Sequence, residues 1–323
     1  MKGHHAHEGQ TGLLADIGGT FTRLAIVGAD GKLGYVATRT NAEFTGPLAL
    51  FGSYLRDLPA VLPPPSRAAV AVACPVIGDE VHLTNLPWSF SASTLAKGLG
   101  LESIRVLNDF TALALSLLHL LPQDSVQVGD GAATPNSPMA VLGPGTGLGV
   151  SGLIPHAHGW TPLATEGGHV TLASCNRQES QLIEWLHARY GHASAERVLS
   201  GNGLVDLYNY LAAGQGEAVA TAERITDLAI NRTDAHARRV FDIFFALLGT
   251  MAGNLALTLG ACGGVYLAGG ILPRVLDLLQ ASSFRERFVA KGRFRAYLEA
   301  IPTYVIVDRY PAFKGLKSIL TQQ

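Results

Sequence analysis

The chain has 323 residues, of which 48% are hydrophobic and 15% are charged. This length exceeds what one hydrophobic core usually supports and the apolar content excludes a disordered chain, so we expect two domains. Lys and Arg total 24 and Asp and Glu total 25, a net charge of −1, which argues against nucleic-acid binding because no basic excess is available to neutralise phosphates.

The N-terminus and the cysteines give limited information. Residues 1–12 contain no apolar run, so we expect no secretory signal there. Three histidines in this segment could bind a metal, but a disordered tail is the favoured interpretation; they are His4, His5 and His7. The cysteines are too few and too scattered for a disulfide framework or a zinc site, which fits a reducing cytoplasm; they are Cys74, Cys175 and Cys262.

Hydrophobic periodicity and turn residues predict the elements in chain order. Strands are predicted at 13–17, 22–27, 33–39, 68–73 and 104–107, with helices at 44–58 and 111–121. A strand–turn–strand unit follows at 140–154, then helices at 176–190, 194–199, 202–213, 217–229 and 234–259, a strand at 265–268 and a helix from 272. A late strand at 304–307 and a helix at 312–320 complete the chain.

The uncharged run from Ile243 to Pro273 raises the question of a membrane span. It contains seven glycines, which divide it into a helix, a turn and a strand. A membrane-spanning helix needs about 20 residues that satisfy their own backbone hydrogen bonds. The run is therefore expected to be part of a protein core.

Two glycine and threonine turns, Gly18-Gly19-Thr20 and Gly145-Thr146-Gly147, each bridge two predicted strands and suggest a duplicated domain. Glycine lets backbone N–H groups approach an anion closely. Either turn alone reads better as a tight hairpin, but the pair, with Asp16 beside the first, favours phosphate binding with Mg²⁺ held by Asp16 mostly through water. The GxGxxG pattern at 147–152 continues a strand instead of opening a helix, which argues against a dinucleotide site.

Polar residues near strand ends and turns are the other candidates. Asn108 and Asp109 separate a strand from a helix, where position alone favours a helix cap for Asp109, although catalytic groups of α/β folds also lie there. Glu166 and His169 flank two glycines and form either a surface turn or a binding site for a small polar ligand. Glu196 is a helix-surface charge or a ligand contact, and Asn85 is a turn residue or an amide reaching a diol.

Together these segments resemble the bacterial glucokinase family of the actin-like/hexokinase ATPase superfamily. The resemblance covers about residues 13–320 and is carried by Asp16-Ile17-Gly18-Gly19-Thr20 with Arg23, Leu107-Asn108-Asp109-Phe110, the Gly143–Gly149 turn, Glu166-Gly167-Gly168-His169, Glu196-Arg197-Val198-Leu199-Ser200-Gly201 and Leu267-Ala268-Gly269-Gly270. The Glu-Gly-Gly-His and Glu-Arg-Val-Leu-Ser-Gly segments are its most specific motifs.

The resemblance implies an α/β, two-domain actin-like ATPase (ribonuclease-H-like) fold with the ligand cleft between the domains. The small domain would take 13–119 and 309–323, and the large domain 120–308. Asp109 would be the base in ATP-dependent phosphorylation of glucose. Glucose would be bound by Asn85, Asn108, Asp109, Glu166, His169 and Glu196. ATP would meet Gly18, Gly19, Thr20, Gly145, Thr146, Gly147, Gly269 and Gly270, with Mg²⁺ at Asp16.

The resemblance also suggests a cytoplasmic homodimer without nucleic-acid or membrane partners. Related repressor and sugar kinases carry a cysteine-rich zinc site after their Glu-x-Gly-His motif, whereas the stretch 170–176 here has Cys175 alone, so no structural zinc is expected. The short segment before the first strand leaves no room for a helix-turn-helix domain. A kinase for another hexose or an amino sugar, a non-catalytic sugar sensor and a filament-forming protein remain alternatives.

Overall fold

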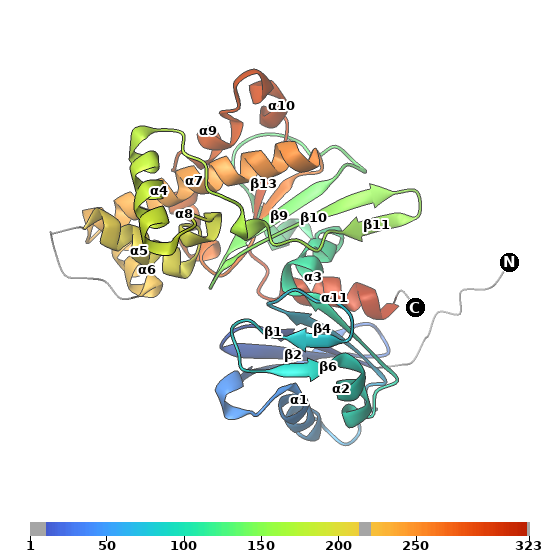
Figure 1. Ribbon diagram of the computed structural model, residues 1–323. Coiled ribbons are helices and arrows are strands. Elements are labelled where there is room, and N and C mark those ends of the chain that lie inside the picture. Colours follow the sequence, from blue (N-terminus) through green and yellow to red (C-terminus); the bar gives the residue numbers. More distant parts are fainter. Residues whose placement is uncertain (1–10, 213–220, 322–323) are drawn as a thin grey trace. The chain divides into compact units, whose positions relative to one another are not determined.

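The computed structural model describes residues 11–212 and 221–321. The chain divides into two compact units, of which unit 1 holds the described residues up to Leu120 and from Arg309 onward, and unit 2 holds Leu121–Asp308. Each unit is built on its own β-sheet with packed helices (Figure 1). The three N-terminal histidines and most of the expected disordered tail lie outside the described residues.

Unit 1 contains a five-stranded sheet in the order β3-β2-β1-β4-β7. Its strands are β1 (Gly12–Ile17), β2 (Phe21–Val27), β3 (Leu33–Thr40), β4 (Arg67–Val72) and β7 (Ser103–Asn108). The first three form an antiparallel meander, and β1, β4 and β7 run parallel. The continuous apolar sequence of β4 is buried from Ala68 to Val72, as expected for a strand covered on both faces.

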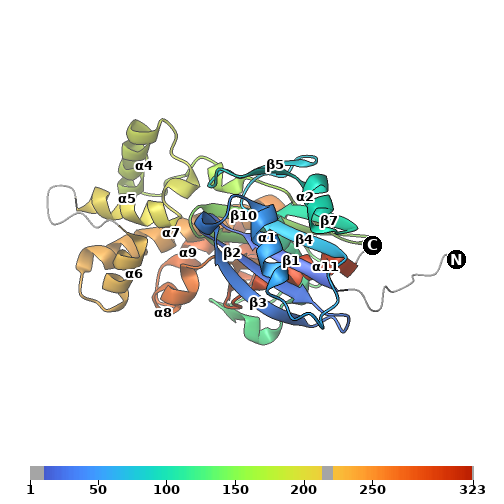
Figure 2. The same ribbon diagram turned by 90° about the horizontal axis from the view of Figure 1, so that it is seen from below.

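Two pairs of helices cover this sheet. Helices α1 (Pro47–Arg56) and α2 (Ala92–Leu99) pack on one face, and α3 (Asp109–Ser116) and α11 (Pro311–Thr321) pack on the other (Figure 1). Figure 2 views unit 1 from the α1 side, with α1 lying across the strands. The shorter elements are η1 (Asn41–Glu43), η2 (Leu117–His119) and a hairpin of β5 (Glu80–His82) and β6 (Ser89–Ser91).

Unit 2 contains a six-stranded sheet in the order β11-β10-β9-β12-β13-β8. Its strands are β8 (Ser125–Gln127), β9 (Met139–Pro144), β10 (Leu148–His156), β11 (Gly159–Pro162), β12 (Val265–Leu267) and β13 (Thr303–Ile306). Strands β9, β12 and β13 are parallel, and β10 pairs antiparallel with β9. The hairpin of β9 and β10 is the predicted strand–turn–strand unit.

The helices of unit 2 form a large apolar core with this sheet. They are α4 (Arg177–Tyr190), α5 (Gly201–Leu211), α6 (Ala222–Ile230), α7 (Ala235–Leu259), α8 (Leu276–Gln280), α9 (Phe284–Val289) and α10 (Arg295–Glu299), with 3₁₀ turns η3 (Pro122–Asp124), η4 (Gly167–His169), η5 (Ala195–Arg197), η6 (Leu272–Val275) and η7 (Gly292–Phe294). By length and composition α7 could cross a membrane, but 72% of its most apolar window is buried inside the protein. It is the central helix of this core.

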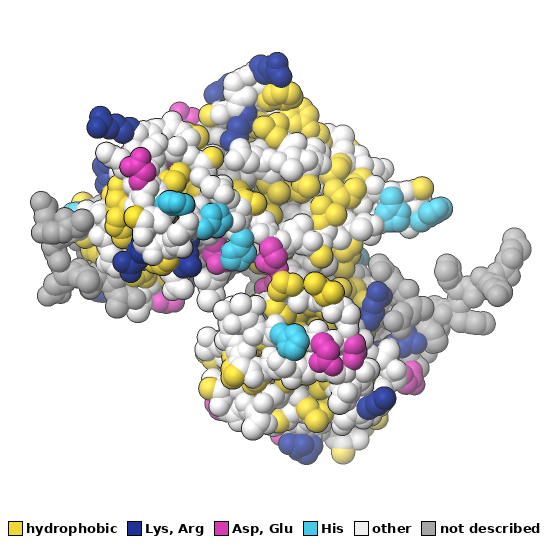
Figure 3. Space-filling view, viewed as in Figure 1, with side chains coloured by type: hydrophobic (Ala, Val, Ile, Leu, Met, Phe, Trp, Pro, Cys, Tyr) yellow, Lys and Arg dark blue, Asp and Glu magenta, His cyan; other side chains and the backbone are white. Residues whose placement is uncertain are grey.

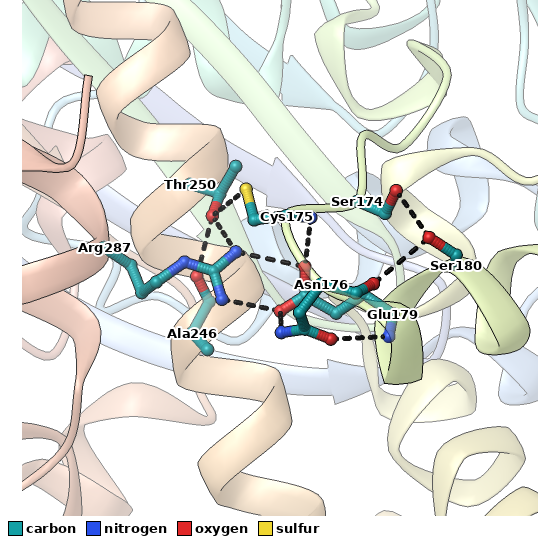
Figure 4. A network of polar contacts seen from close by, with 8 residues as sticks. All are labelled: Ser174, Cys175, Asn176, Glu179, Ser180, Ala246, Thr250 and Arg287. Carbon is teal, nitrogen blue, oxygen red and sulfur yellow. Dashed lines mark hydrogen bonds and ion pairs between the residues drawn. The ribbon is translucent and has the colours of Figure 1, made fainter. Parts of the chain in front are cut away.

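A buried ion pair connects three of these helices (Figure 4). Arg287 of α9 contacts the Glu179 carboxylate of α4 at 2.6 and 3.1 Å, and it also donates to Thr250 of α7 at 2.7 Å. The Glu179 side chain is only 4% exposed. Its two oxygens also accept hydrogen bonds from the Cys175 backbone N–H and from the side-chain amide of Asn176, so the buried charge is fully engaged.

Several predicted boundaries were wrong for identifiable reasons. The helix predicted at 44–58 begins at Pro47, because proline fits the first helical turn, and it ends at Arg56. The helix predicted at 194–199 is only the short 3₁₀ turn η5. The hairpin of β5 and β6 was missed because each strand has three residues. The end of the helix predicted at 202–213 and the start of that at 217–229 fall partly on residues 213–220, outside the described residues.

Candidate active site

The turn between β1 and β2 carries the first group of candidate residues. Gly18 donates its N–H to the Phe21 carbonyl oxygen at 3.0 Å, which closes the turn around Gly19 and Thr20. Asp16, near the end of β1, accepts a hydrogen bond from Arg23 of β2 at 3.1 Å. Burial raises the pKa of the Asp16 carboxyl, and the Arg23 guanidinium opposes that shift. A carboxylate and a glycine turn therefore lie side by side.

Asn108 and Asp109 lie at the same end of this sheet. The parallel register places Ile17 of β1 beside Val72 of β4, and Val72 beside Asn108 of β7. The carboxyl ends of β1 and β7 are thus level, separated by roughly 10 Å because one strand lies between them. Asp109 follows at the first position of α3. The pairing of the strands therefore brings Asp16 and Asp109 to the same end of the sheet, at the carboxyl ends of β1 and β7.

The expectation that Asp109 caps its helix was wrong, because Asn108 is the N-cap of α3. The Asn108 side-chain oxygen accepts from the backbone N–H groups of Phe110 and Thr111 at 2.9 and 3.2 Å. Its amide nitrogen donates to the Cys74 carbonyl oxygen at 3.3 Å. Both lone pairs of the oxygen and one amide hydrogen are therefore used, so Asn108 has one N–H left for a ligand.

Asn85 lies on the loop between β5 and β6 and is exposed. The loop is closed by a hydrogen bond from the Leu83 N–H to the Trp88 carbonyl oxygen at 3.0 Å, and Trp88 is buried. The Asn85 Cβ lies beside Gly19, 3.6 Å from where a Cβ at Gly19 would be. This candidate sugar contact is thus next to the first candidate phosphate turn, within unit 1.

The second glycine turn, between β9 and β10, is packed against Glu196 in unit 2. Gly145 donates its N–H to the Gly147 carbonyl oxygen at 2.8 Å, which closes the turn. The Leu148 N–H donates to Glu196 Oε2 at 2.9 Å. The same oxygen fills the space that a side chain at Gly147 would need. Residue 147 must therefore be glycine for Glu196 to occupy this position.

The segment with Glu166 and His169 packs on the strand that follows this turn. It forms η4, and Thr165 donates its hydroxyl to the Val150 carbonyl oxygen at 2.5 Å. A Cβ at Gly168 would collide with the Leu148 carbonyl oxygen, so the two glycines of the segment allow it to lie directly on β10. Glu166 and His169 are exposed on either side of this contact.

Gly269 reaches the same turn from β12. It has a φ of +90° and lies against the Pro144 carbonyl, where a Cβ would collide. Ala268, just before it, donates its N–H to the Leu142 carbonyl oxygen at 2.9 Å. Unit 2 therefore contains one cluster of candidate residues. It consists of the second glycine turn (Gly145–Gly147), Glu196, the η4 segment and the Gly269-Gly270 pair.

Sequence reasoning missed Asn41, which follows β3 and is 1% exposed. Its side-chain amide donates to the Gly18 carbonyl oxygen at 2.8 Å, so Asn41 is hydrogen-bonded to the first glycine turn. An isolated asparagine after a strand has no local motif, and only the pairing of β3 with β2 places it there. No local sequence signal identifies this residue.

Known proteins of similar sequence match nearly the whole chain. A family model described as Glucokinase matches residues 13–323. The chain is 47% identical over 312 residues to a glucokinase of Paramagnetospirillum magneticum, covering 96% of this chain and 97% of that relative. It spans about half the length of some other relatives that are bifunctional proteins, for example 49% of one from Paraburkholderia xenovorans at 44% identity.

Solved structures agree. The crystal structure of a glucokinase from an Antarctic psychrotroph has a TM-score of 0.85 and 34% identity, covering 97% of this chain and 99% of that one. A ROK family glucokinase from Streptomyces griseus, solved with glucose and AMPPNP, has the same fold with a TM-score of 0.66 at 17% identity, covering 96% and 98% of the two chains. The expected two-domain actin-like ATPase fold is confirmed, and the chain belongs to the glucokinase family.

Proposed function

We propose that this enzyme transfers the γ-phosphoryl group of ATP to the 6-hydroxyl of D-glucose, giving glucose 6-phosphate and ADP. The observation that carries the proposal is the convergence on Leu148. Its N–H binds Glu196, its carbonyl lies on the Glu166–His169 segment, and it directly follows the glycine turn. Candidate sugar contacts and a candidate phosphate turn are thus built around one residue.

Glucose would be recognised by carboxylate, amide and imidazole side chains. Each carboxylate oxygen accepts hydrogen bonds from sugar hydroxyls, while amide and imidazole groups both donate and accept. We assign this role to Asn85, Asn108, Asp109, Glu166, His169 and Glu196. Because Asn108 has one free N–H, it would contribute a single donor to a sugar oxygen, and its larger role is to fix the start of α3.

ATP phosphates would be bound by the two glycine turns. Backbone N–H groups in such turns act as partial positive charges for anions. We assign Gly18, Gly19 and Thr20 of the first turn and Gly145, Thr146 and Gly147 of the second. Gly269 and Gly270 would contact the adenosine, since they lie against the second turn. The AMPPNP complex of the Streptomyces griseus neighbour supports ATP as the donor.

The residues present fit Mg²⁺ as a companion of ATP. Over residues 11–212 and 221–321, no three His, Cys, Asp or Glu side chains gather closely enough to hold a metal ion. One carboxylate, with water and substrate phosphates, is the donor set that Mg²⁺ commonly takes. Asp16 would hold it mostly through water. When bound with ATP, Mg²⁺ supplies neutralisation of the charge on the phosphates.

Asp109 would act as the general base. A carboxylate near the attacking hydroxyl accepts its proton as the oxygen bonds to phosphorus, and phosphoryl transfer needs little other covalent help. Asn108 caps α3 and fixes its start, and it thereby fixes the position of Asp109, the first residue of that helix. Positioning of the two substrates and electrostatic stabilisation would supply most of the remaining rate.

We further propose a cytoplasmic homodimer in which units 1 and 2 are the two catalytic domains. The net charge of −1 supports small-molecule substrates over nucleic acid. The surface in Figure 3 also supports small-molecule substrates over nucleic acid, because Lys and Arg side chains on the face shown occur in small, separate groups.

A coupled assay of ADP release with ATP and glucose, mannose or N-acetylglucosamine tests the proposal. We expect turnover to be highest with glucose, and equal rates with all three sugars would contradict the glucose assignment. The Asp109→Asn variant should lose at least about 100-fold in kcat while calorimetry still detects glucose binding. Unchanged turnover in this variant would exclude Asp109 as the base.

A further inference from the structure

Asn41 is a buried polar residue beneath the first glycine turn. It is the first residue after β3 and is 1% exposed, and the neighbouring Thr22 of β2 is fully buried. Burying an amide is costly unless its hydrogen-bonding groups are satisfied. The partners of Asn41 therefore indicate what this residue does.

Those partners are the turn itself. The Asn41 side-chain amide donates to the Gly18 carbonyl oxygen at 2.8 Å, and its backbone N–H donates to the Thr20 carbonyl oxygen at 2.9 Å. The side-chain oxygen accepts the Thr22 hydroxyl at 2.7 Å, which fixes the orientation of the amide. Asn41 thus holds two of the turn's carbonyl groups from the same side.

Holding these carbonyls sets the direction of a backbone donor. In a planar trans peptide, the C=O of one residue and the N–H of the next point in opposite directions. Since the Gly18 carbonyl points to Asn41, the Gly19 N–H points away from it. Glycines on both sides of this peptide impose little steric preference of their own, so the bond from Asn41 favours this orientation within the turn that the Gly18 N–H closes.

We propose that Asn41 is a positioning residue for phosphoryl transfer, which fixes the Gly18–Gly19 peptide so that the Gly19 N–H faces the ATP phosphates. This inference rests on the proposed function, because it needs the first turn to bind ATP. Asn41 itself does not touch the substrate. Without its amide, the peptide could rotate and the turn would present a carbonyl oxygen to the phosphate part of the time.

The test compares variants that differ in one hydrogen-bonding group. Asn41→Ala removes both side-chain bonds. Asn41→Asp keeps an acceptor for Thr22 but places a second oxygen against the Gly18 carbonyl. The control is Thr11→Val, at the other end of β1, which removes buried hydroxyl bonds to the Pro63 and Pro64 carbonyls at 3.0 Å each. Thr11 is 5% exposed, so its loss matches Asn41 as a buried polar substitution.

Kinetics with ATP and glucose, calorimetry with MgADP and thermal melting are measured on the full chain. We expect both Asn41 variants to raise the KM for ATP and the Kd for MgADP about tenfold, with the KM for glucose unchanged, because both lose the hydrogen bond to the Gly18 carbonyl oxygen. Thr11→Val should lower the Tm but leave both KM values unchanged.

The two hypotheses fail in different ways. If the wild-type enzyme does not phosphorylate glucose with ATP, the proposed function is wrong. If the wild type is active and Asn41→Ala lowers only the Tm, with the KM for ATP and the Kd for MgADP unchanged, Asn41 is merely structural and the inference is overturned. A rise in the KM for glucose equal to that for ATP would also overturn it, because the effect would then not be confined to the turn.

Discussion

Leu148 donates its backbone N–H to the carboxylate of Glu196, 48 residues further along the chain, at 2.9 Å. Leu148 is the first residue of β10 after the glycine turn, and Glu196 lies on the 3₁₀ turn η5. The contact joins a residue proposed to bind sugar with the strand that ends a loop proposed to bind phosphate. A substitution that displaces Glu196 should therefore also affect the glycine turn, and a substitution in the turn should affect Glu196.

The two glycines of this turn allow the coupling to be tested in matched variants. A Cβ at Gly147 would displace the Glu196 carboxylate, whereas a Cβ at Gly145 meets open space. We expect Gly147→Ala to raise the KM values for both glucose and ATP. Gly145→Ala should raise the KM for ATP alone, because its methyl group would enter open space on the turn that we propose binds the phosphates. Steady-state kinetics with each substrate varied in turn would measure this, and identical profiles for the two variants would refute the coupling.

Glu196→Gln separates the two roles of the carboxylate. Glutamine has the same size, and its one carbonyl oxygen can still accept the Leu148 N–H. The amide nitrogen then replaces the oxygen left for a sugar hydroxyl and cannot accept a hydrogen bond. We expect the KM for glucose to rise about 10- to 100-fold, with the KM for ATP nearly unchanged. In Glu196→Ala both values should rise, since the Leu148 N–H also loses its partner.

Residues with a local signal were predicted well. Glycine turns between strands, the apolar strand β4 and the long helix α7 follow from periodicity and turn chemistry alone. Asn108 illustrates the limit of prediction from local sequence. The pair Asn108-Asp109 marks a helix start, but which of the two residues is the N-cap depends on the backbone angles. Asn41 and the bond from Leu148 to Glu196 depend on strand pairing and tertiary packing, which no short segment encodes.

Helix α11 supports the helix that carries Asp109, and a glycine makes this contact possible. A Cβ at Gly315 of α11 would collide with the Ala112 carbonyl oxygen of α3. We expect Gly315→Ala to lower the free energy of unfolding by about 1–3 kcal/mol through overpacking, and also to lower kcat by shifting α3. The matched control is Gly52→Ala in α1, where a Cβ would meet only the Arg56 side chain at 3.4 Å.

In that control, alanine should be neutral or stabilising by up to about 1 kcal/mol, because it favours helix more than glycine does. Denaturant unfolding and the glucose assay would compare the two variants. If Gly315→Ala were as stable and active as Gly52→Ala, close packing of α11 on α3 would not matter for the position of Asp109.

The ion pair between Arg287 and Glu179 predicts an acid limit to stability. Burial acts to raise the pKa of Glu179, but hydrogen bonds from Arg287, from the Cys175 N–H and from Asn176 outweigh it and hold the pKa below its ordinary value of 4.5. A carboxyl with a lowered pKa in the folded state contributes stability above its unfolded pKa. That contribution is lost as the pH falls through the lower, folded value.

We therefore expect the free energy of unfolding to decrease below about pH 4.5 more steeply in the wild type than in Glu179→Gln, measured by urea denaturation across pH. Near pH 7, Arg287→Met should cost about 3–5 kcal/mol, because it leaves the Glu179 carboxylate buried without its cation. The double variant Arg287→Met with Glu179→Leu should recover much of that loss, since the carboxylate that Arg287→Met leaves unpaired is then absent as well. Equal destabilisation by the single and double variants would mean that the cost comes from lost packing and not from the unpaired charge.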